Sequence, residues 1–109
     1  MGTALAASSR VWFTLSHGIL NEVYYPRIDQ ACTRDFGLIV TDGRGFFSEE
    51  KRHAKSTHVP VADGVPAFAV TSRCARDRYR IDKLVLTDPR RDVVLQRIEF
   101  HALHGSLAE

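Results

Sequence analysis

Three runs rich in β-branched and aromatic residues follow one another in the second half of the chain, with only short turns between them. They are Ala67–Cys74, Arg78–Thr87 and Val93–Leu103. The turn between the last two begins Asp88–Pro89, a pair that favours a type I turn. Short turns join antiparallel neighbours, so the sequence predicts a three-stranded meander. A helix over Val93–Leu103 is the alternative, and its β-branched residues argue against it.

The first half of the chain shows similar strand signals. Arg10–Ser16 alternates apolar and polar residues and leads through a turn at His17–Gly18 into Ile19–Tyr25. Pro26 should end this second strand, because proline has no N–H to donate to a sheet. We expect a polar loop after it. Asp42–Gly45 lies between two apolar runs and predicts a hairpin turn.

The middle strand of the meander changes the face on which its apolar residues lie. Tyr79 and Ile81 share one face, whereas Leu84 and Leu86 share the other. Either a bulge lies near Asp82–Lys83, or both faces are covered along part of the strand. Double coverage is typical of two packed sheets. The predicted fold is all-β, an antiparallel β-sandwich of about seven strands with little or no helix.

Length and charge set limits on the functions to consider. A chain of 109 residues forms at most one domain, and its net charge of +2 requires no acidic partner. Its apolar runs are too short to span a bilayer, so we predict no membrane association. The opening segment Met1–Arg10 lacks the pattern of a signal peptide, and the cellular location stays open.

The acidic residues of the first half are not expected to form the pair that a sugar hydrolase needs, with one carboxyl group on either side of the scissile bond. Glu49 and Glu50 are neighbours on an expected strand and should point to opposite faces. Asp29 and Asp35 lie in or near the polar loop and could converge. The arginines beside them favour ion pairs that fix the loop. The sequence therefore predicts no catalytic residue.

Histidine and cysteine offer equally little chemistry. The closest histidine pairs are His101 with His104 and His53 with His58. Zinc needs three or four converging ligands, so we predict no metal and no cofactor. Cys32 and Cys74 are expected to be partly buried free thiols, with one structural disulfide as the alternative.

Charged residues of the meander are predicted to lie on solvated surfaces. Tyr79 has the opposite parity to Arg78 and Arg80, so the tyrosine belongs to the core and the arginines face solvent. We therefore expect no nucleic-acid partner, although arginines around an aromatic residue can bind single strands. Asp88 and Asp92 are expected to cap an exposed turn.

Trp12, Tyr24 and Tyr25 form the aromatic group of the first half. Aromatic faces can stack on sugar rings, and tyrosine hydroxyls can bond sugar hydroxyls. Core packing is the alternative.

Two longer stretches carry a resemblance to a known family. The first runs from Ser9 to His53 and contains "NEVYYPRIDQACTRD"; the second comprises Gly64–Val70 and Arg78–Phe100. Together they resemble the N-terminal domain of bacterial glucoamylases and glucodextranases, in glycoside hydrolase family 15. The resemblance covers nearly the whole chain.

The resemblance implies an N-terminal β-supersandwich joined to a separate barrel of paired α-helices. That barrel carries a general acid and a general base, and hydrolyses α-glucosidic bonds from the non-reducing end with inversion. Residues 1–109 would then be a shortened N-terminal β-sandwich domain without the catalytic barrel. Its expected partners are the barrel of the same polypeptide and, through the parent enzyme, an α-glucan.

The resemblance also implies a role for the loop after the second strand. Tyr24, Tyr25, Arg27 and Asp29 would line or brace the rim of the sugar pocket, or else only hold the two domains together. The expected function is therefore non-catalytic bracing, with a free-standing carbohydrate-binding module as the alternative. A partial sandwich exposes strand edges, so we also expect dimerisation or strand exchange.

Overall fold

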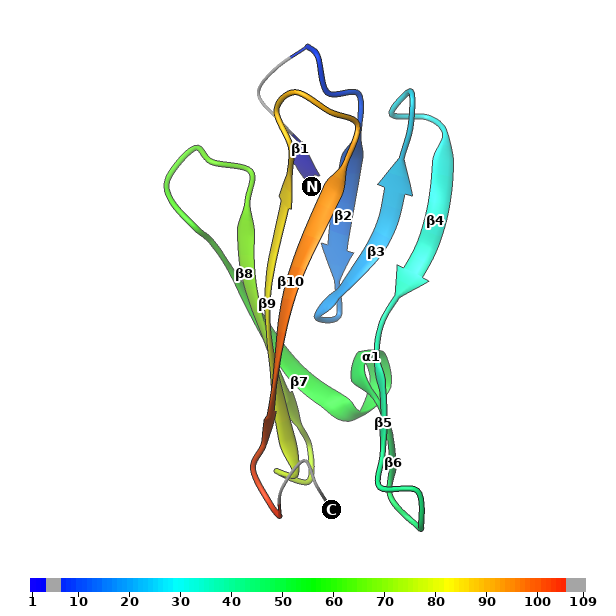
Figure 1. Cartoon of the computed structure of the whole chain (residues 1–109), viewed down its shortest axis with the longest axis vertical. Helices are drawn as coiled ribbons and strands as arrows, with labels where there is room; N and C mark the ends of the chain where they lie inside the picture. Colours follow the sequence, from blue (N-terminus) through cyan, green and yellow to red (C-terminus); the bar gives the residue numbers. More distant parts are fainter. Residues whose placement is uncertain (4–6, 106–109) are drawn as a thin grey trace.

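The first of the sheets is built by the N-terminal part of the chain. The computed structural model describes residues 1–3 and 7–105, and they form an elongated molecule of 47 × 27 × 21 Å. Four antiparallel strands pair in the order β1-β2-β3-β4 (Figure 1). Their bounds are β1 Gly2–Thr3, β2 Trp12–Ser16, β3 Ile19–Tyr24 and β4 Ala31–Phe36.

A second four-stranded sheet, of order β10-β9-β8-β7, forms the other layer (Figure 1). Its strands are β7 Ala54–Pro60, β8 Phe68–Cys74, β9 Tyr79–Thr87 and β10 Val94–Ala102. Between the two sheets in sequence lies a hairpin of β5 (Ile39–Thr41) and β6 (Phe47–Glu49), followed by the one-turn helix α1 (Glu50–His53). The predicted antiparallel all-β fold, the meander and the hairpin at Asp42–Gly45 are confirmed, and the helix alternative for Val93–Leu103 is wrong.

Two strands, β1 and β4, were not predicted. All six residues of β4 are exposed, where the sequence suggested only a polar loop. The loop is in fact short, from Tyr25 to Gln30, and Asp35 lies within the strand. An exposed strand has no buried face, so its sequence carries no apolar alternation by which to recognise it.

The predicted turn at His17–Gly18 is present and depends on its glycine. Both residues have positive φ, 53° and 76°, as a type I′ hairpin turn requires. A Cβ at Gly18 would also lie 2.6 Å from both the Cβ of Ser56 and the Oγ of Ser72. The turn therefore packs directly on the second sheet.

Strand β9 is regular along its whole length, so the bulge alternative near Asp82–Lys83 is wrong. Its pairing with β10 runs without a register shift from Tyr79 to Thr87, and buried and half-buried residues alternate strictly. Lys83 occupies an inward position, with 4% of its surface exposed. Leu84 and Leu86 consequently lie on the outer face and are only half-buried.

Buried side chains of the described residues form two apolar clusters. One lies between the two sheets and is built around Phe13, Leu20 and Val85. The other lies under the β5–β6 hairpin and contains Phe46, Cys74, Tyr79 and Ile81. Burial of such side chains contributes about 1.5–3 kcal/mol each, so these clusters hold the layers together.

Polar groups occupy the inner surface as well as apolar ones. The Nζ of Lys83 lies 2.6 Å from Oε1 of Glu50 and 2.7 Å from Oε2. Glu50 was expected on a strand, but it is the first residue of α1 and is fully buried. The hydroxyls of Ser48 and Tyr79 form a further buried hydrogen bond of 2.7 Å.

Both cysteines are free, so the disulfide alternative is wrong. Cys74 is buried in the core, whereas Cys32 on β4 is exposed rather than partly buried. Among the described residues, no helix has the length and apolar character needed to span a bilayer.

Candidate functional site

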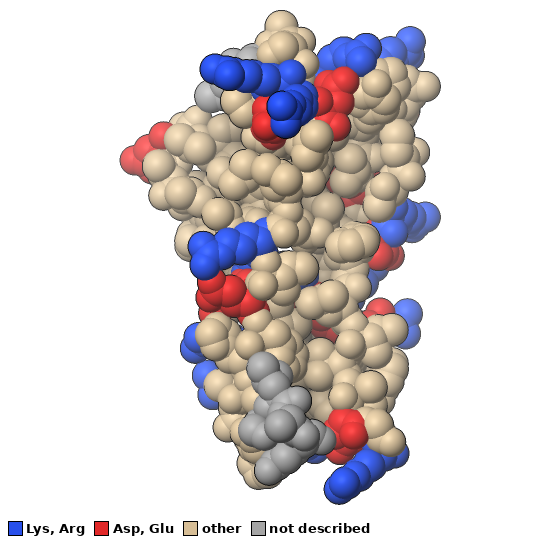
Figure 2. Space-filling model, viewed as in Figure 1, with Lys and Arg blue, Asp and Glu red and all other residues tan. Residues whose placement is uncertain are grey.

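Three segments distant in sequence meet at one end of the sandwich, at the top of Figure 1. They are residues 8–10, the β3–β4 loop with residues 24–30, and the β9–β10 turn with residues 88–93. We call this region the loop end. Figure 2 shows basic and acidic side chains lying next to one another there. All four residues predicted to form a rim belong to it.

The β3–β4 loop is closed by its own backbone. Tyr25 N donates to the carbonyl of Gln30 at 3.0 Å, and Gln30 N donates to the carbonyl of Arg27 at 3.0 Å. The peptide bond between Tyr25 and Pro26 is cis. The two hydrogen bonds give the loop a defined shape.

Arg27 and Asp29 form a two-pronged ion pair on this loop. Arg27 Nε and Nη2 donate to the two carboxylate oxygens of Asp29 at 3.0 and 2.7 Å. These bonds hold the pKa of Asp29 below its usual range. Both side chains are open to solvent, with 69% and 61% exposed. The predicted ion pair within the loop is therefore confirmed.

Asp35 has a different partner from Asp29, so the two aspartates do not converge. Its carboxylate accepts a hydrogen bond of 2.8 Å from Lys51 of α1, rather than pairing with Arg34. The bond from Lys51 also lowers the pKa of Asp35. The two aspartates thus serve separate structural contacts.

Arg10 ties the loop to the β9–β10 turn. Its guanidinium lies 5.3 Å from the centre of the Tyr25 ring, and Nη2 donates to the Tyr25 hydroxyl at 3.1 Å and to Asp92 at 3.0 Å. The backbone N–H of Arg10 also donates to Asp92, at 2.5 Å. Asp92 is therefore an anchor between segments rather than only a turn cap. Its pKa is lowered, first by the backbone N–H and then by the guanidinium of Arg10.

Two serines strengthen the same junction. Ser8 Oγ donates to the carbonyl of Pro89 at 2.6 Å, and Ser9 Oγ donates to the carbonyl of Arg91 at 2.9 Å. Sequence reasoning missed these contacts, because the partners are more than 80 residues apart. Three consecutive residues, Ser8, Ser9 and Arg10, therefore bond to the β9–β10 turn.

The aromatic residues are divided between two environments. Trp12 and Tyr24 lie opposite each other on β2 and β3, and both are half-buried. The Tyr24 hydroxyl donates to the Glu22 carboxylate, which raises the pKa of Tyr24. Tyr25 remains 38% exposed and contacts Arg10.

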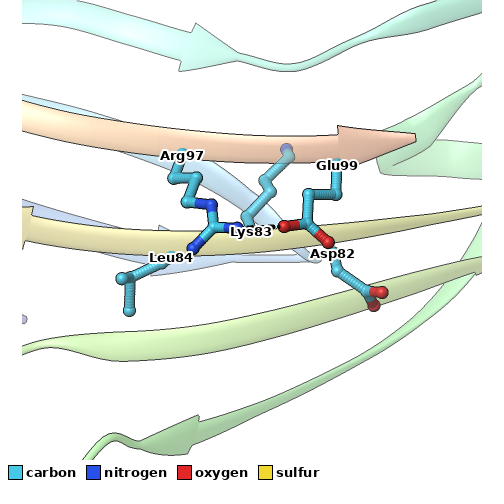
Figure 3. Close-up of a pocket in the computed structure, with 5 residues that line it drawn as sticks. All are labelled: Asp82, Lys83, Leu84, Arg97 and Glu99. Carbon is cyan, nitrogen blue, oxygen red and sulfur yellow. Dashed lines mark hydrogen bonds and ion pairs between the residues drawn. The ribbon is translucent and has the colours of Figure 1, made fainter.

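A carboxylate pair that no sequence pattern indicated lies on the outer face of the second sheet. Asp82 and Glu99 are opposite one another on β9 and β10 and line a cavity of about 150 Å³ together with Lys83, Leu84 and Arg97 (Figure 3). Arg80 donates to Asp82 at 3.1 Å, and Arg97 donates to Glu99. The cavity is well below the ~300 Å³ of a typical ligand pocket. Both carboxylates therefore belong to a surface ion-pair network.

No group of His, Cys, Asp and Glu within residues 1–3 and 7–105 is arranged to hold a metal ion. The loop end carries groups that can form hydrogen bonds and charge contacts. It presents a fixed polar loop with an exposed tyrosine and an exposed ion pair.

Comparison with known proteins gives concordant matches. The family model described as "Glucodextranase, domain N" matches residues 1–108. A glucoamylase from Clostridium sp. (strain G0005) is 38% identical over 107 residues, which is 98% of this chain and 15% of that protein. The crystal structure of a bacterial glucoamylase complexed with acarbose superimposes with a TM-score of 0.95 at 39% identity. That match covers 97% of this chain and 16% of the other, so this chain spans a small part of its relatives' length.

Proposed function

Because the chain belongs to the family of glucodextranase domain N, we propose that it is the non-catalytic N-terminal domain of a glucoamylase-type glycoside hydrolase. In this proposal, residues 1–109 form a β-sandwich domain that packs against the helical catalytic barrel of the same polypeptide. The barrel hydrolyses α-glucosidic bonds, and the sandwich braces it.

The cross-linked loop end is the observation that carries this proposal. Its three segments are joined through Arg10, Tyr25 and Asp92, and its loop is already closed by backbone bonds. A preorganised loop loses little conformational entropy when it docks. Exposed and rigid polar loops are therefore well suited to hold a second domain in a fixed position.

Four residues carry the finer part of the proposal. Tyr24, Tyr25, Arg27 and Asp29 line or brace the rim of the sugar pocket. Support comes from the exposure of Tyr25 and of the Arg27–Asp29 ion pair. Tyr24 acts from the end of β3 by fixing where the loop begins.

Steady-state hydrolysis of an α-glucan by the full polypeptide tests the rim. We expect Tyr25→Ala to lower kcat/KM about tenfold, a loss of about 1.4 kcal/mol of transition-state stabilisation. Tyr25→Phe removes only the hydroxyl and should lose less. Unchanged kcat and KM in Tyr25→Ala would reject the rim role and leave only domain packing.

Two measurements on the 109-residue chain test the wider proposal. Release of glucose from starch by the purified chain alone would contradict a non-catalytic role. Calorimetric titration with maltooligosaccharides should show no binding at millimolar concentration. A measured affinity would instead favour a free-standing carbohydrate-binding module.

We further propose that the isolated chain self-associates through a strand edge. Every residue of β4 is exposed, and within the described residues β4 pairs on one side only, with β3. An unpaired edge of this kind is a template for another strand. Sedimentation velocity at increasing concentration should reveal a dimer. A monomer at the highest concentration would refute this point.

A further inference from the structure

A groove of about 490 Å³ lies at the end of the molecule opposite the loop end, at the bottom of Figure 1. The β5–β6 hairpin forms one wall, and the ends of β9 and β10 form the other. Its volume lies within the ~300–1,000 Å³ of typical binding sites. The predicted rim and the proposed sugar pocket do not involve it.

Aromatic residues form the base of this groove. Phe46 and Tyr79 are 6% and 1% exposed. Tyr79 stacks on Phe100 with 5.7 Å between ring centres, and Phe46 meets Tyr79 edge to face at 6.4 Å. Because these rings belong to or pack against a core cluster, their positions at the base of the groove are fixed by packing.

Arginine covers the aromatic base. The guanidinium carbon of Arg78 lies 4.3 Å from the centre of the Phe46 ring. A stacked guanidinium uses its face, so its N–H edge remains available for a carboxylate. The same contact occupies one face of the Phe46 ring. The groove therefore fits an anion better than a neutral sugar.

The acidic residue of the groove, Asp42, already has partners within the groove. Asp42 Oδ1 accepts hydrogen bonds from the backbone N–H groups of Arg44 and Phe46, at 2.9 and 3.0 Å. These bonds hold the pKa of Asp42 below its usual range. Its other oxygen, Oδ2, forms an ion pair with Arg78 at 3.9 Å, which is longer than a hydrogen bond.

Two basic side chains of the groove remain available. Arg44 and His104 are exposed, and their side chains make no hydrogen bond or ion pair with any other described residue. The Asp42 bonds fix the backbone from which Arg44 projects. The groove thus combines an apolar base with more positive than negative charge.

We propose that this groove docks an acidic segment of the catalytic barrel, an inference that depends on the proposed function. Carboxylates of that segment bind Arg44 and Arg78, and an adjoining aliphatic side chain packs beside Phe100. Charge complementarity selects this partner, because an arginine-lined groove with one committed carboxylate disfavours neutral or basic segments.

Calorimetric unfolding of the full polypeptide tests the proposal through Arg44→Glu. A docked domain is stabilised by its partner, so the wild type should unfold in one coupled transition. Arg44→Glu should release this domain as a separate transition at least about 5 °C lower. High salt should produce the same change in the wild type, because it screens exposed charges.

Lys55→Glu is the matched control. Lys55 is an exposed base on β7, outside the groove, and its reversal should leave the single transition intact. The 109-residue chain with Arg44→Glu should unfold at the wild-type temperature, which shows that the variant still folds. Arg44→Ala serves as a second variant with a smaller effect in the same direction.

Each contrary result has a distinct meaning. A single transition at the wild-type temperature in Arg44→Glu would overturn the groove but not the bracing function. Two transitions in the wild type would overturn both. If the isolated wild-type chain is a dimer that Arg44→Glu dissociates, a second copy occupies the groove and the barrel segment is excluded.

Discussion

Lys83 and Glu50 form an ion pair enclosed within the protein. Their charged atoms are 2.6 Å apart, and only 2% and 0% of their side chains are exposed. Glu50 also accepts a hydrogen bond from Leu38 N at 3.0 Å, while its own N–H donates to the Leu38 carbonyl at 2.9 Å. Glu50 therefore connects Leu38, just before β5, to Lys83 of β9. This connection positions the β5–β6 hairpin, which forms one wall of the groove.

Removing one partner of this pair should be strongly destabilising. Lys83→Met leaves the Glu50 carboxylate buried without its counter-charge, which costs about 3–5 kcal/mol. Urea unfolding followed by circular dichroism measures the loss. A change below about 1 kcal/mol would show that water reaches Glu50.

The double variant Lys83→Met with Glu50→Gln is the control for charge. Glutamine removes the charge but can still accept the hydrogen bond from Leu38 N. The double variant should therefore be more stable than Lys83→Met alone. Both variants carry the same methionine, so the reverse order would mean that an unpaired Glu50 charge is not the main cost of Lys83→Met.

Gly18→Ala should destabilise the chain more than Gly43→Ala. Both glycines have positive φ, 76° and 75°, which costs an alanine about 1–2 kcal/mol. Only Gly18 also meets neighbouring atoms, at 2.6 Å, whereas a Cβ at Gly43 meets nothing within 4 Å. Overpacking adds about 1–3 kcal/mol at Gly18. Equal unfolding midpoints for the two variants would contradict this packing of the turn on the second sheet.

Local signals in the sequence were sufficient for much of the fold. The turns around Asp42–Gly45 and Asp88–Asp92 are specified by neighbouring residues, and both hairpins are present. Lys83 could not be placed in the same way, because a lysine is buried only with a partner, and its partner Glu50 is 33 residues away. The apolar residues of β9 seemed to change face because the inward position between Ile81 and Val85 is occupied by a charged residue, Lys83.

In the candidate site, too, local contacts could be predicted from sequence and long-range contacts could not. Arg27 and Asp29 are two residues apart, and their ion pair could be predicted. The bond between Arg10 and Asp92 joins residues 82 apart, so it depends on how the strands assemble. Sequence therefore indicated the loop but not what holds it.

The two cysteines should differ sharply in reactivity. Cys32 is exposed on β4, whereas Cys74 is 3% exposed in the core. Thiols must be reached by the reagent to react. A thiol-disulfide reagent should modify one thiol rapidly in the native chain and the second only in denaturant. Cys32→Ser should abolish the rapid phase, and rapid modification of both thiols would contradict the buried position of Cys74.

Acid should weaken the loop end through Asp92. Its pKa is lowered in the folded chain by hydrogen bonds from Arg10, whereas an unfolded aspartate titrates near about 3.9. A lowered pKa means that the contribution to stability is complete above about pH 4 and is lost as pH falls through the folded value. Asp92→Asn lacks this ionisation, so its deficit relative to wild type should be largest near pH 7 and shrink towards pH 3.

Urea unfolding of both proteins across this range measures the difference in stability. Comparing the two proteins cancels the contributions of Asp29, Asp35 and Asp42, which both contain. A deficit that stays constant with pH would exclude the Arg10–Asp92 contact as its source.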